Sequence, residues 1–169
     1  MDKPDLQQPP QQILMLGLSD TVVEAVLQEV DKLKAKHALP STGSRQVWRT
    51  SPRGGEGLCL QQVEAQKAVE AADAVVWVIE DGAESLQERH LIAVSQVISH
   101  TQNNDCVLFF VVLQTSSQHF TVSRVVDDLR LWQMRNRVWF CTGTSLNGDD
   151  GLYEGLNWLT KKLEERVSF

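Results

Sequence analysis

Residues 13–24 read ILMLGLSDTVVE, and this stretch decides how the rest of the chain is interpreted. An apolar run ends at Gly17 and passes through a short turn into helical spacing, which is the strand–turn–helix frame of a phosphate-binding loop. Such a loop reads G-x-x-x-x-G-K-[ST]. Counted from Gly17, the second glycine falls on Val22, the lysine on Val23 and the hydroxyl residue on Glu24. The frame of the loop is present, and the residues that contact phosphate and Mg²⁺ are not.

Each of these replacements opposes phosphate binding. Val22 is β-branched, and such residues resist the positive φ that glycine adopts readily. Val23 cannot supply the ammonium group that neutralises phosphate charge. Glu24 places a carboxylate where a hydroxyl would hold the metal, and we interpret it as a capping-box partner of Thr21 at the start of a helix. The stretch therefore predicts a nucleotide-binding scaffold whose phosphate site has been lost.

Composition limits the class of protein. The 169 residues, 42% of them hydrophobic, suit a single globular domain, and a net charge of −6 argues against non-specific binding to nucleic acid. No apolar run approaches the roughly 18 residues of a membrane span. Cys59, Cys106 and Cys141 form no C-x-x-C pair, so neither a disulfide framework nor a zinc site is indicated. We expect a cytoplasmic protein with reduced thiols, and a nuclear location is left open.

Hydrophobic spacing predicts an α/β domain. Residues 1–11 are rich in Gln and Pro and are expected to form a disordered tail, whereas 12–169 form one domain. Apolar strands alternate with amphipathic helices, a pattern typical of a mainly parallel sheet with helices on both faces. The expected strands are 12–18, 46–48, 58–61, 74–79, 106–113 and 136–142, and the expected helices are 21–36, 63–72, 84–100, 121–134 and 150–167.

Two segments resemble the Arf-like small GTPases of the Ras superfamily. Residues 150–159, DGLYEGLNWL, are very similar to the family's D-G-L-Y-E-G-L-D-W-L, and ILMLGL at 13–18 is similar to its first strand. Weaker similarities lie at 77–81 and 40–43, and the resemblance covers roughly 11–167. It implies the three-layer fold of P-loop NTPases, with about six strands and about five helices. It also implies a guanine nucleotide with Mg²⁺.

The other nucleotide motifs of this family are altered as well. The switch-one threonine corresponds to Ser41, and D-x-G-G-Q corresponds to 52–56, where Glu56 replaces the glutamine that orients water. The guanine-reading N-K-x-D ends on Ser116, which has no carboxylate, and an unpaired donor in a closed site costs about 1–3 kcal/mol. The last guanine contact falls on Leu146 and its neighbours. The expected degenerate site comprises Gly17, Val22, Val23, Glu24, Ser116 and Leu146.

The sequence thus predicts a non-catalytic pseudo-GTPase that acts as a protein-interaction module or complex subunit. It is expected to need no cofactor or metal and to bind a protein partner through the surface equivalent to the GTPase switches. Nucleic acid is not an expected partner. Asp2 replaces the glycine that myristoylation requires, and no amphipathic N-terminal helix is evident, so no membrane anchor is expected. The expected partner-binding residues are Pro40, Ser41, Arg45, Trp48, Arg49, Arg53 and Glu56.

Two other interpretations stay open. A divergent small GTPase could still bind GTP or GDP with Mg²⁺ and act as a regulatory switch in trafficking, using main-chain amides around Gly17. An unrelated flavodoxin-like α/β enzyme is a remote alternative, for which 80–81 is the only acidic pair at a strand end. Trp48 lies in a polar stretch, where an aromatic residue either packs on the sheet or faces a partner.

Overall fold

In a computed structural model, the chain forms an α/β domain with a five-stranded parallel sheet in the order β2-β1-β3-β4-β5. The structure describes residues 11–37, 46–50, 67, 69–80, 84–101, 105–113, 121–134, 137–145 and 150–167. The strands are β1 Gln11–Gly17, β2 Gln46–Thr50, β3 Ala74–Glu80, β4 Val107–Leu113 and β5 Trp139–Thr144. The helices are α1 Asp20–His37, α3 Glu84–His100, α4 Val122–Asp128, the 3₁₀ turn η1 Leu131–Gln133, and α5 Asp150–Val167.

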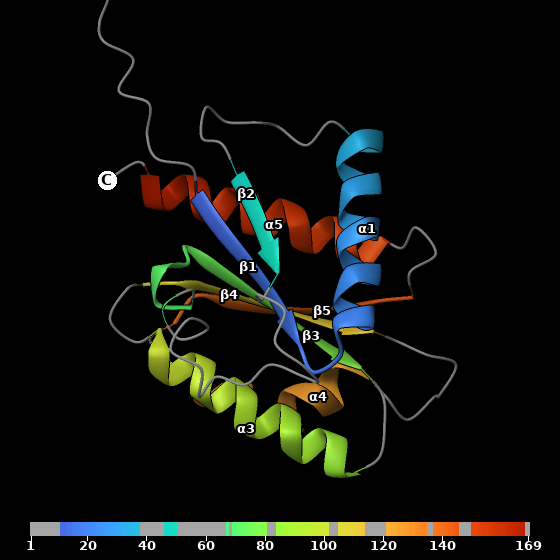
Figure 1. Cartoon of the computed structure of the whole chain (residues 1–169), viewed down its shortest axis with the longest axis vertical. Helices are drawn as coiled ribbons and strands as arrows, with labels where there is room; N and C mark the ends of the chain where they lie inside the picture. Colours follow the sequence, from blue (N-terminus) through green and yellow to red (C-terminus); the bar gives the residue numbers. More distant parts are fainter. Residues whose placement is uncertain are drawn as a thin grey trace, which may run out of the picture.

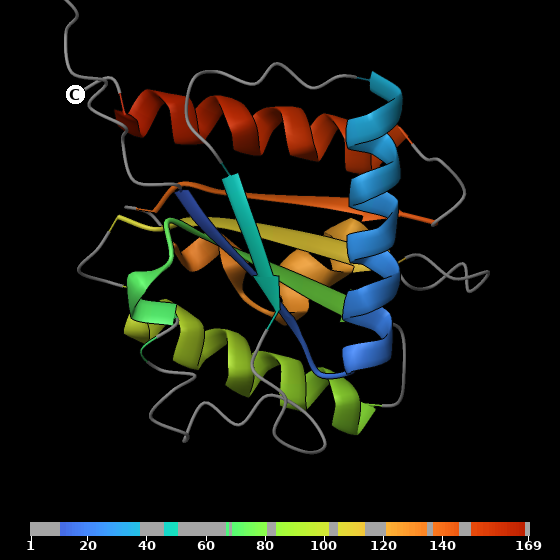
Figure 2. The same ribbon diagram turned by 45° about the horizontal axis from the view of Figure 1, so that its top comes forward.

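Three layers result from the hydrophobic pattern. The two central strands β3 and β4 are buried along almost their whole length, as expected for uninterrupted apolar runs covered on both faces. Helices α1 and α5 cover one face, and α3 and α4 cover the other together with a helical turn at 69–71 (Figures 1 and 2). This arrangement confirms the expected three-layer α/β class with a mainly parallel sheet.

The register of the sheet shows which strand ends lie side by side at its carboxyl edge. Gly17 at the end of β1 pairs with Val78 of β3, and Glu80 at the end of β3 pairs with Leu113 of β4. The carboxyl ends of these three strands therefore meet along one edge of the central layer. Ligands of open parallel sheets bind beyond this edge.

The close approach of α5 to the sheet explains two glycines of the GLYEGLNWL segment. A Cβ on Gly151 would lie within van der Waals overlap of the Gly143 carbonyl oxygen, and one on Gly155 would overlap the Phe109 ring. Without these two side chains, the helix can bury Leu152, Leu156, Leu159 and Leu163 against β4 and β5. Trp158 stacks on Phe140, with ring centroids 5.1 Å apart. The segment thus encodes tight helix–sheet packing.

Three expected boundaries were wrong. Gln11, assigned to the tail, begins β1, and its side-chain amide donates to the Leu163 carbonyl of α5. The helix expected at 121–134 ends at Asp128, because Arg130 adopts a left-handed conformation with φ 54°, and only a 3₁₀ turn follows. The last strand spans 139–144 where 136–142 was expected. The strand expected at 58–61 lies outside the described residues, so the sixth strand stays a prediction.

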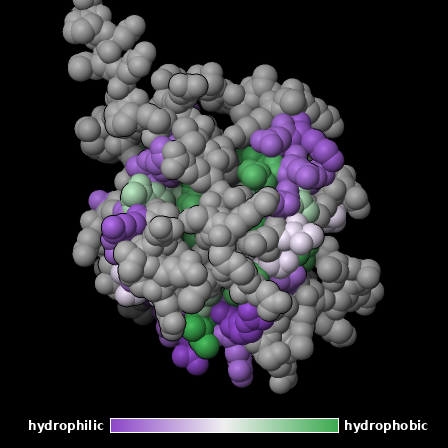
Figure 3. Space-filling model, viewed as in Figure 1, coloured by the Kyte–Doolittle hydropathy of each residue, from purple (hydrophilic) through white to green (hydrophobic). Residues whose placement is uncertain are grey.

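The outward face of α1 is hydrophilic. Figure 3 shows hydrophilic residues gathered over this helix, and a small hydrophobic patch over α3 between hydrophilic residues. Among residues 21–33 of α1, the exposed positions are Thr21, Glu24, Gln28, Asp31 and Lys32. Within the described part of the chain, every helix is too short or too polar to cross a membrane.

Candidate functional site

The junction between β1 and α1 is the position at which a phosphate-binding loop would lie. β1 ends at Gly17 and α1 begins at Asp20, so that only Leu18 and Ser19 connect the strand to the helix. The N–H of Val23 donates to the carbonyl oxygen of Ser19 at 3.0 Å, a bond of the first helical turn. The amide at the position of the motif's lysine is therefore used within the helix and does not face outward as a phosphate donor.

The side chain of Val23 packs into the space beside the end of β1. Val23 is 4% exposed and belongs to the cluster that joins α1 to the sheet. A Cβ built on Gly17 would lie 2.8 Å from Val23 Cγ2 and 3.2 Å from the Val78 carbonyl oxygen. The glycine is thus needed for the close approach of α1 to β1 and β3. An isopropyl group occupies this junction, where the family's motif has a lysine.

Among the described residues, the charges at this end of the sheet are unfavourable for an anion. Glu24 is exposed on α1 and Glu80 is half-buried at the end of β3. Among the residues described at 16–24, 78–80, 111–113 and 142–145 there is no Lys or Arg. A triphosphate placed here would meet carboxylates without a compensating cation from these segments.

The capping box expected at Thr21 and Glu24 was wrong. An N-cap residue precedes the first helical residue, and α1 begins at Asp20, one position before Thr21. Thr21 therefore lies within the first helical turn, and the carbonyl of Ser19 accepts the first bond of the helix. The helix starts earlier than its hydrophobic spacing indicated, which shortens the loop further.

His90 is a buried polar residue that the sequence analysis did not place in the core. It follows the helical spacing of Ala93, Val94 and Val97, which is the signal that could have identified it. Its Nδ1 accepts a hydrogen bond of 3.1 Å from the indole Nε1 of Trp77, and the two rings meet edge-on at 89°. Nε2 has no hydrogen-bond partner among the described residues. The pKa of His90 is lowered to about 4, mainly by burial and to a smaller extent by the charge of Arg89.

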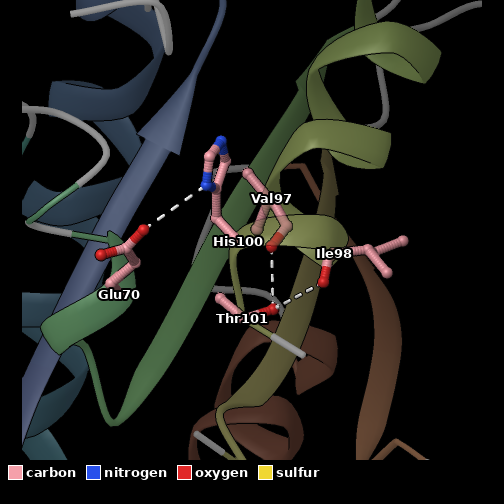
Figure 4. A network of polar contacts seen from close by, with 5 residues as sticks. All are labelled: Glu70, Val97, Ile98, His100 and Thr101. Atoms are coloured by element: carbon pink, nitrogen blue, oxygen red, sulfur yellow. Dashed lines mark hydrogen bonds and ion pairs between the residues drawn. The ribbon is translucent and has the colours of Figure 1, made fainter. Parts of the chain in front are cut away.

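A second polar cluster lies at the C-terminal end of α3 (Figure 4). The hydroxyl of Thr101 donates to the carbonyl of Val97 at 2.8 Å, and His100 lies 3.7 Å from the carboxylate of Glu70. The guanidinium of Arg137 donates to Thr101 Oγ1 at 2.6 Å and to the Ile98 carbonyl at 3.2 Å. These contacts join the end of α3 to the start of β5, and we interpret them as structural.

The structure places only part of the predicted site. It brings Gly17 and Val23 into contact, places Val22 half-buried in α1, and leaves Glu24 facing solvent. Trp48 and Arg49 belong to β2, beside β1 at the edge of the sheet, with Trp48 in register with Ile13. The other predicted residues lie outside the described part of the chain and are Pro40, Ser41, Arg45, Arg53, Glu56, Ser116 and Leu146.

Reactive side chains do not gather within the described ranges. Cys141 is a free thiol in β5, and burial raises its pKa to about 12, which opposes formation of a nucleophilic thiolate. The described residues hold no group of three or more His, Cys, Asp or Glu side chains that could bind a metal ion.

The parallel sheet, its two helical layers and the β1–α1 junction define a small-GTPase-like fold. A sequence profile described as the ADP-ribosylation factor family matches residues 66–163, which is more than half of the chain. The chain belongs to the ADP-ribosylation factor family. The match covers most of α5, including Gly151 and Gly155.

Proposed function

We propose that this chain is a pseudo-GTPase of the ADP-ribosylation factor family that acts without bound nucleotide as a protein-interaction module or complex subunit. The observation that carries the proposal is the β1–α1 junction. Val23 fills the position of the phosphate-binding lysine, its amide bonds to Ser19, and Glu24 adds a carboxylate at the mouth of the site. These residues do not fit a guanosine phosphate with Mg²⁺.

The fold can be stable without a ligand at this position. Both faces of the sheet carry continuous hydrophobic clusters, and the junction itself is closed by the apolar side chain of Val23. In a nucleotide-dependent protein, the bound ligand would contribute to stability by mass action. Here, packing of Val23 against Gly17 and Val78 takes the place of that contribution.

The partner surface in this proposal is the switch-equivalent segment 40–56, of which β2 is described. Among the described strands, β2 lies last in the sheet beside β1, and we infer that a protein partner would reach the sheet on its outer side. We place the protein in the cytoplasm, with the nucleus as a second location. Neither nucleic acid nor direct membrane contact is part of the proposed function.

A divergent GTPase is the second candidate, and family membership favours it, because relatives of this type bind guanine nucleotides. The two candidates are distinguished by titrating purified protein with fluorescent GDP and GTP analogues in the presence of Mg²⁺, with an active small GTPase as positive control. Extraction of the protein as purified tests for bound guanine nucleotide. We expect neither binding nor nucleotide. Dissociation constants in the micromolar range or below would overturn the proposal in favour of the GTPase.

The interaction surface is tested separately by partner capture from cell extract. Trp48→Ala, on β2, is expected to abolish capture of partners that the unaltered chain retains. Trp132→Ala is the matched control, because Trp132 is 57% exposed on η1 and belongs to a different part of the fold. Equal loss with both variants, or no loss with Trp48→Ala, would contradict a switch-equivalent partner surface.

A further inference from the structure

Helix α3 is attached to the sheet by two polar contacts that respond differently to pH. At its C-terminal end, Arg137 donates to Thr101 Oγ1 at 2.6 Å and to the Ile98 carbonyl at 3.2 Å. In its first half, the Trp77 indole donates to Nδ1 of His90 at 3.1 Å. An arginine keeps its charge throughout the range in which a histidine titrates. Acid therefore acts on the attachment at His90 and not on the one at Arg137.

The buried position of His90 accepts only the neutral ring. The side chain has no exposed surface, and the lone pair of Nδ1 is occupied by the Trp77 indole. The neutral ring carries its proton on Nε2, which has no hydrogen-bond partner among the described residues. A second proton at Nδ1 would oppose the indole N–H and place a charge in an apolar core. The charged ring therefore does not fit while α3 lies on the sheet.

The described charges around His90 do not favour its protonation. The residues of β1, β3 and β4 that line this face are apolar, up to Glu80 at the end of β3. On α3, Glu88 and Arg89 are exposed, the charged residues of α4 are exposed as well, and Glu70 lies beside the other end of α3. Burial, with a smaller effect of the positive charge of Arg89, lowers the pKa of His90 from 6.5 to about 4.

We propose that acidification releases the first half of α3 from the sheet, so that residues 88–96 detach while Arg137 holds residues 97–101 in place. The detached state hydrates the charged ring of His90, so proton uptake favours it. Detachment also exposes the buried side chains of Ala93 and Val94, which keeps this state a minority at neutral pH. A helical segment this short is marginal in water, so its main-chain hydrogen bonds open once it leaves the sheet.

Proton linkage sets the size of the effect. His90 titrates near pH 6.5 when detached and near pH 4 when buried. Lowering the pH from 7.5 to 5 therefore raises the equilibrium constant for detachment about 25-fold. The direction follows from the same values, because the detached state takes up the proton first as the pH falls.

Hydrogen exchange of single amides in the full chain at pH 7.5 and pH 5, corrected for the intrinsic exchange rate at each pH, measures this opening. The opening constants of residues 91–94 should rise about 25-fold and at pH 5 should exceed those of β4 at least tenfold. The N–H of Thr101 donates to the Val97 carbonyl at 3.1 Å and should be better protected than that of Ala93 at pH 5. A helix that frays from its end would show the reverse order.

Three variants locate the effect. His90→Gln retains an acceptor for the Trp77 indole without titrating, and it should abolish the rise at residues 91–94. Ser95→Ala is the matched control, because it changes an exposed position of the same helix and should retain the rise. Arg137→Met should remove the extra protection of Thr101 and leave the response of residues 91–94 to pH unchanged.

Two results in the unaltered chain alone would overturn the proposal. One is an opening constant at pH 5 that is the same for residues 91–94 as for β4, because α3 would then leave the sheet only when the whole domain unfolds. The other is an opening constant at residues 91–94 that does not change with pH. A rise that persists in His90→Gln, or protection of Thr101 that persists in Arg137→Met, would also contradict it.

Discussion

The buried imidazole of His90 should make the stability of this domain depend on pH in a narrow window. His90 has no exposed surface, and its Nδ1 accepts the indole hydrogen bond of Trp77. The neutral ring therefore carries its proton on Nε2. A second proton would have to be added at Nδ1, against the donor of Trp77 and in an apolar core. Burial, with a smaller effect of Arg89, accordingly lowers the pKa from 6.5 to about 4.

The sign of the effect follows from proton linkage. As the pH falls through 6.5, the unfolded chain binds a proton at His90, whereas the folded chain does so only near pH 4. Acidification within this window therefore favours the unfolded state. The interval of about 2.5 pH units, at about 1.36 kcal/mol per unit, corresponds to about 3.4 kcal/mol in full. About 2 kcal/mol of this would be lost between pH 7.5 and pH 5.

The assay is guanidinium unfolding, followed by circular dichroism at several pH values from 7.5 to 5. His90→Gln retains an acceptor for the Trp77 indole but does not titrate. Between these two pH values, the unaltered chain should lose about 2 kcal/mol more stability than this variant. Ser95→Ala serves as the control, because it changes an exposed position of α3 that does not titrate and should retain the pH dependence of the unaltered chain.

Parallel stability curves for the unaltered chain and His90→Gln would refute the reasoning. They would mean that His90 takes up its proton at the same pH in the folded and unfolded states, so that burial beside Trp77 does not oppose its charge. A constant offset between the two curves would not matter, because each protein is compared with itself across the pH range.

Three further predictions concern packing. Gly155→Ala should destabilise the domain by about 1–2 kcal/mol in chemical unfolding, because the new methyl group overlaps the Phe109 ring and this outweighs the better helix propensity of alanine. Arg137→Met should cost about 1–3 kcal/mol, since Thr101 and the end of α3 lose a charged donor. Val23→Lys should lower stability by more than about 2 kcal/mol and should not restore binding of fluorescent GDP, because Glu24 and the short loop remain.

Glu154 is exposed on the same helix, and Glu154→Ala should change stability by less than about 0.5 kcal/mol. If Glu154→Ala lowers stability as much as Gly155→Ala does, the overlap with the Phe109 ring is not the cause of the loss. Arg124→Met removes an exposed arginine whose guanidinium lies 3.6 Å from the Asp128 carboxylate, and it should be nearly neutral. Recovery of nucleotide binding by Val23→Lys alone would show that the junction can open into a phosphate loop.

The sequence by itself determined the class of fold and most of the core. Uninterrupted apolar runs identified β3 and β4, because a strand covered on both faces needs no polar positions. Helical spacing identified the buried faces of α1, α3 and α5, including Leu152 and its three successors. The replacements at Val22, Val23 and Glu24 were evident from spacing alone. These features depend on residues close together in the chain.

Only the tertiary structure decided how the candidate site is closed. The first residue of α1 and the packing of Val23 beside Gly17 and Val78 depend on how closely the helix approaches β1 and β3. Of these two strands, β3 lies about sixty residues away in the sequence. The end of the helix before Arg130 likewise depends on tertiary packing, because the turn at Arg130 places Leu131 in the core. The place of β5 at the end of the described sheet is a property of strand order. Such features depend on contacts between distant segments, which local sequence patterns do not specify.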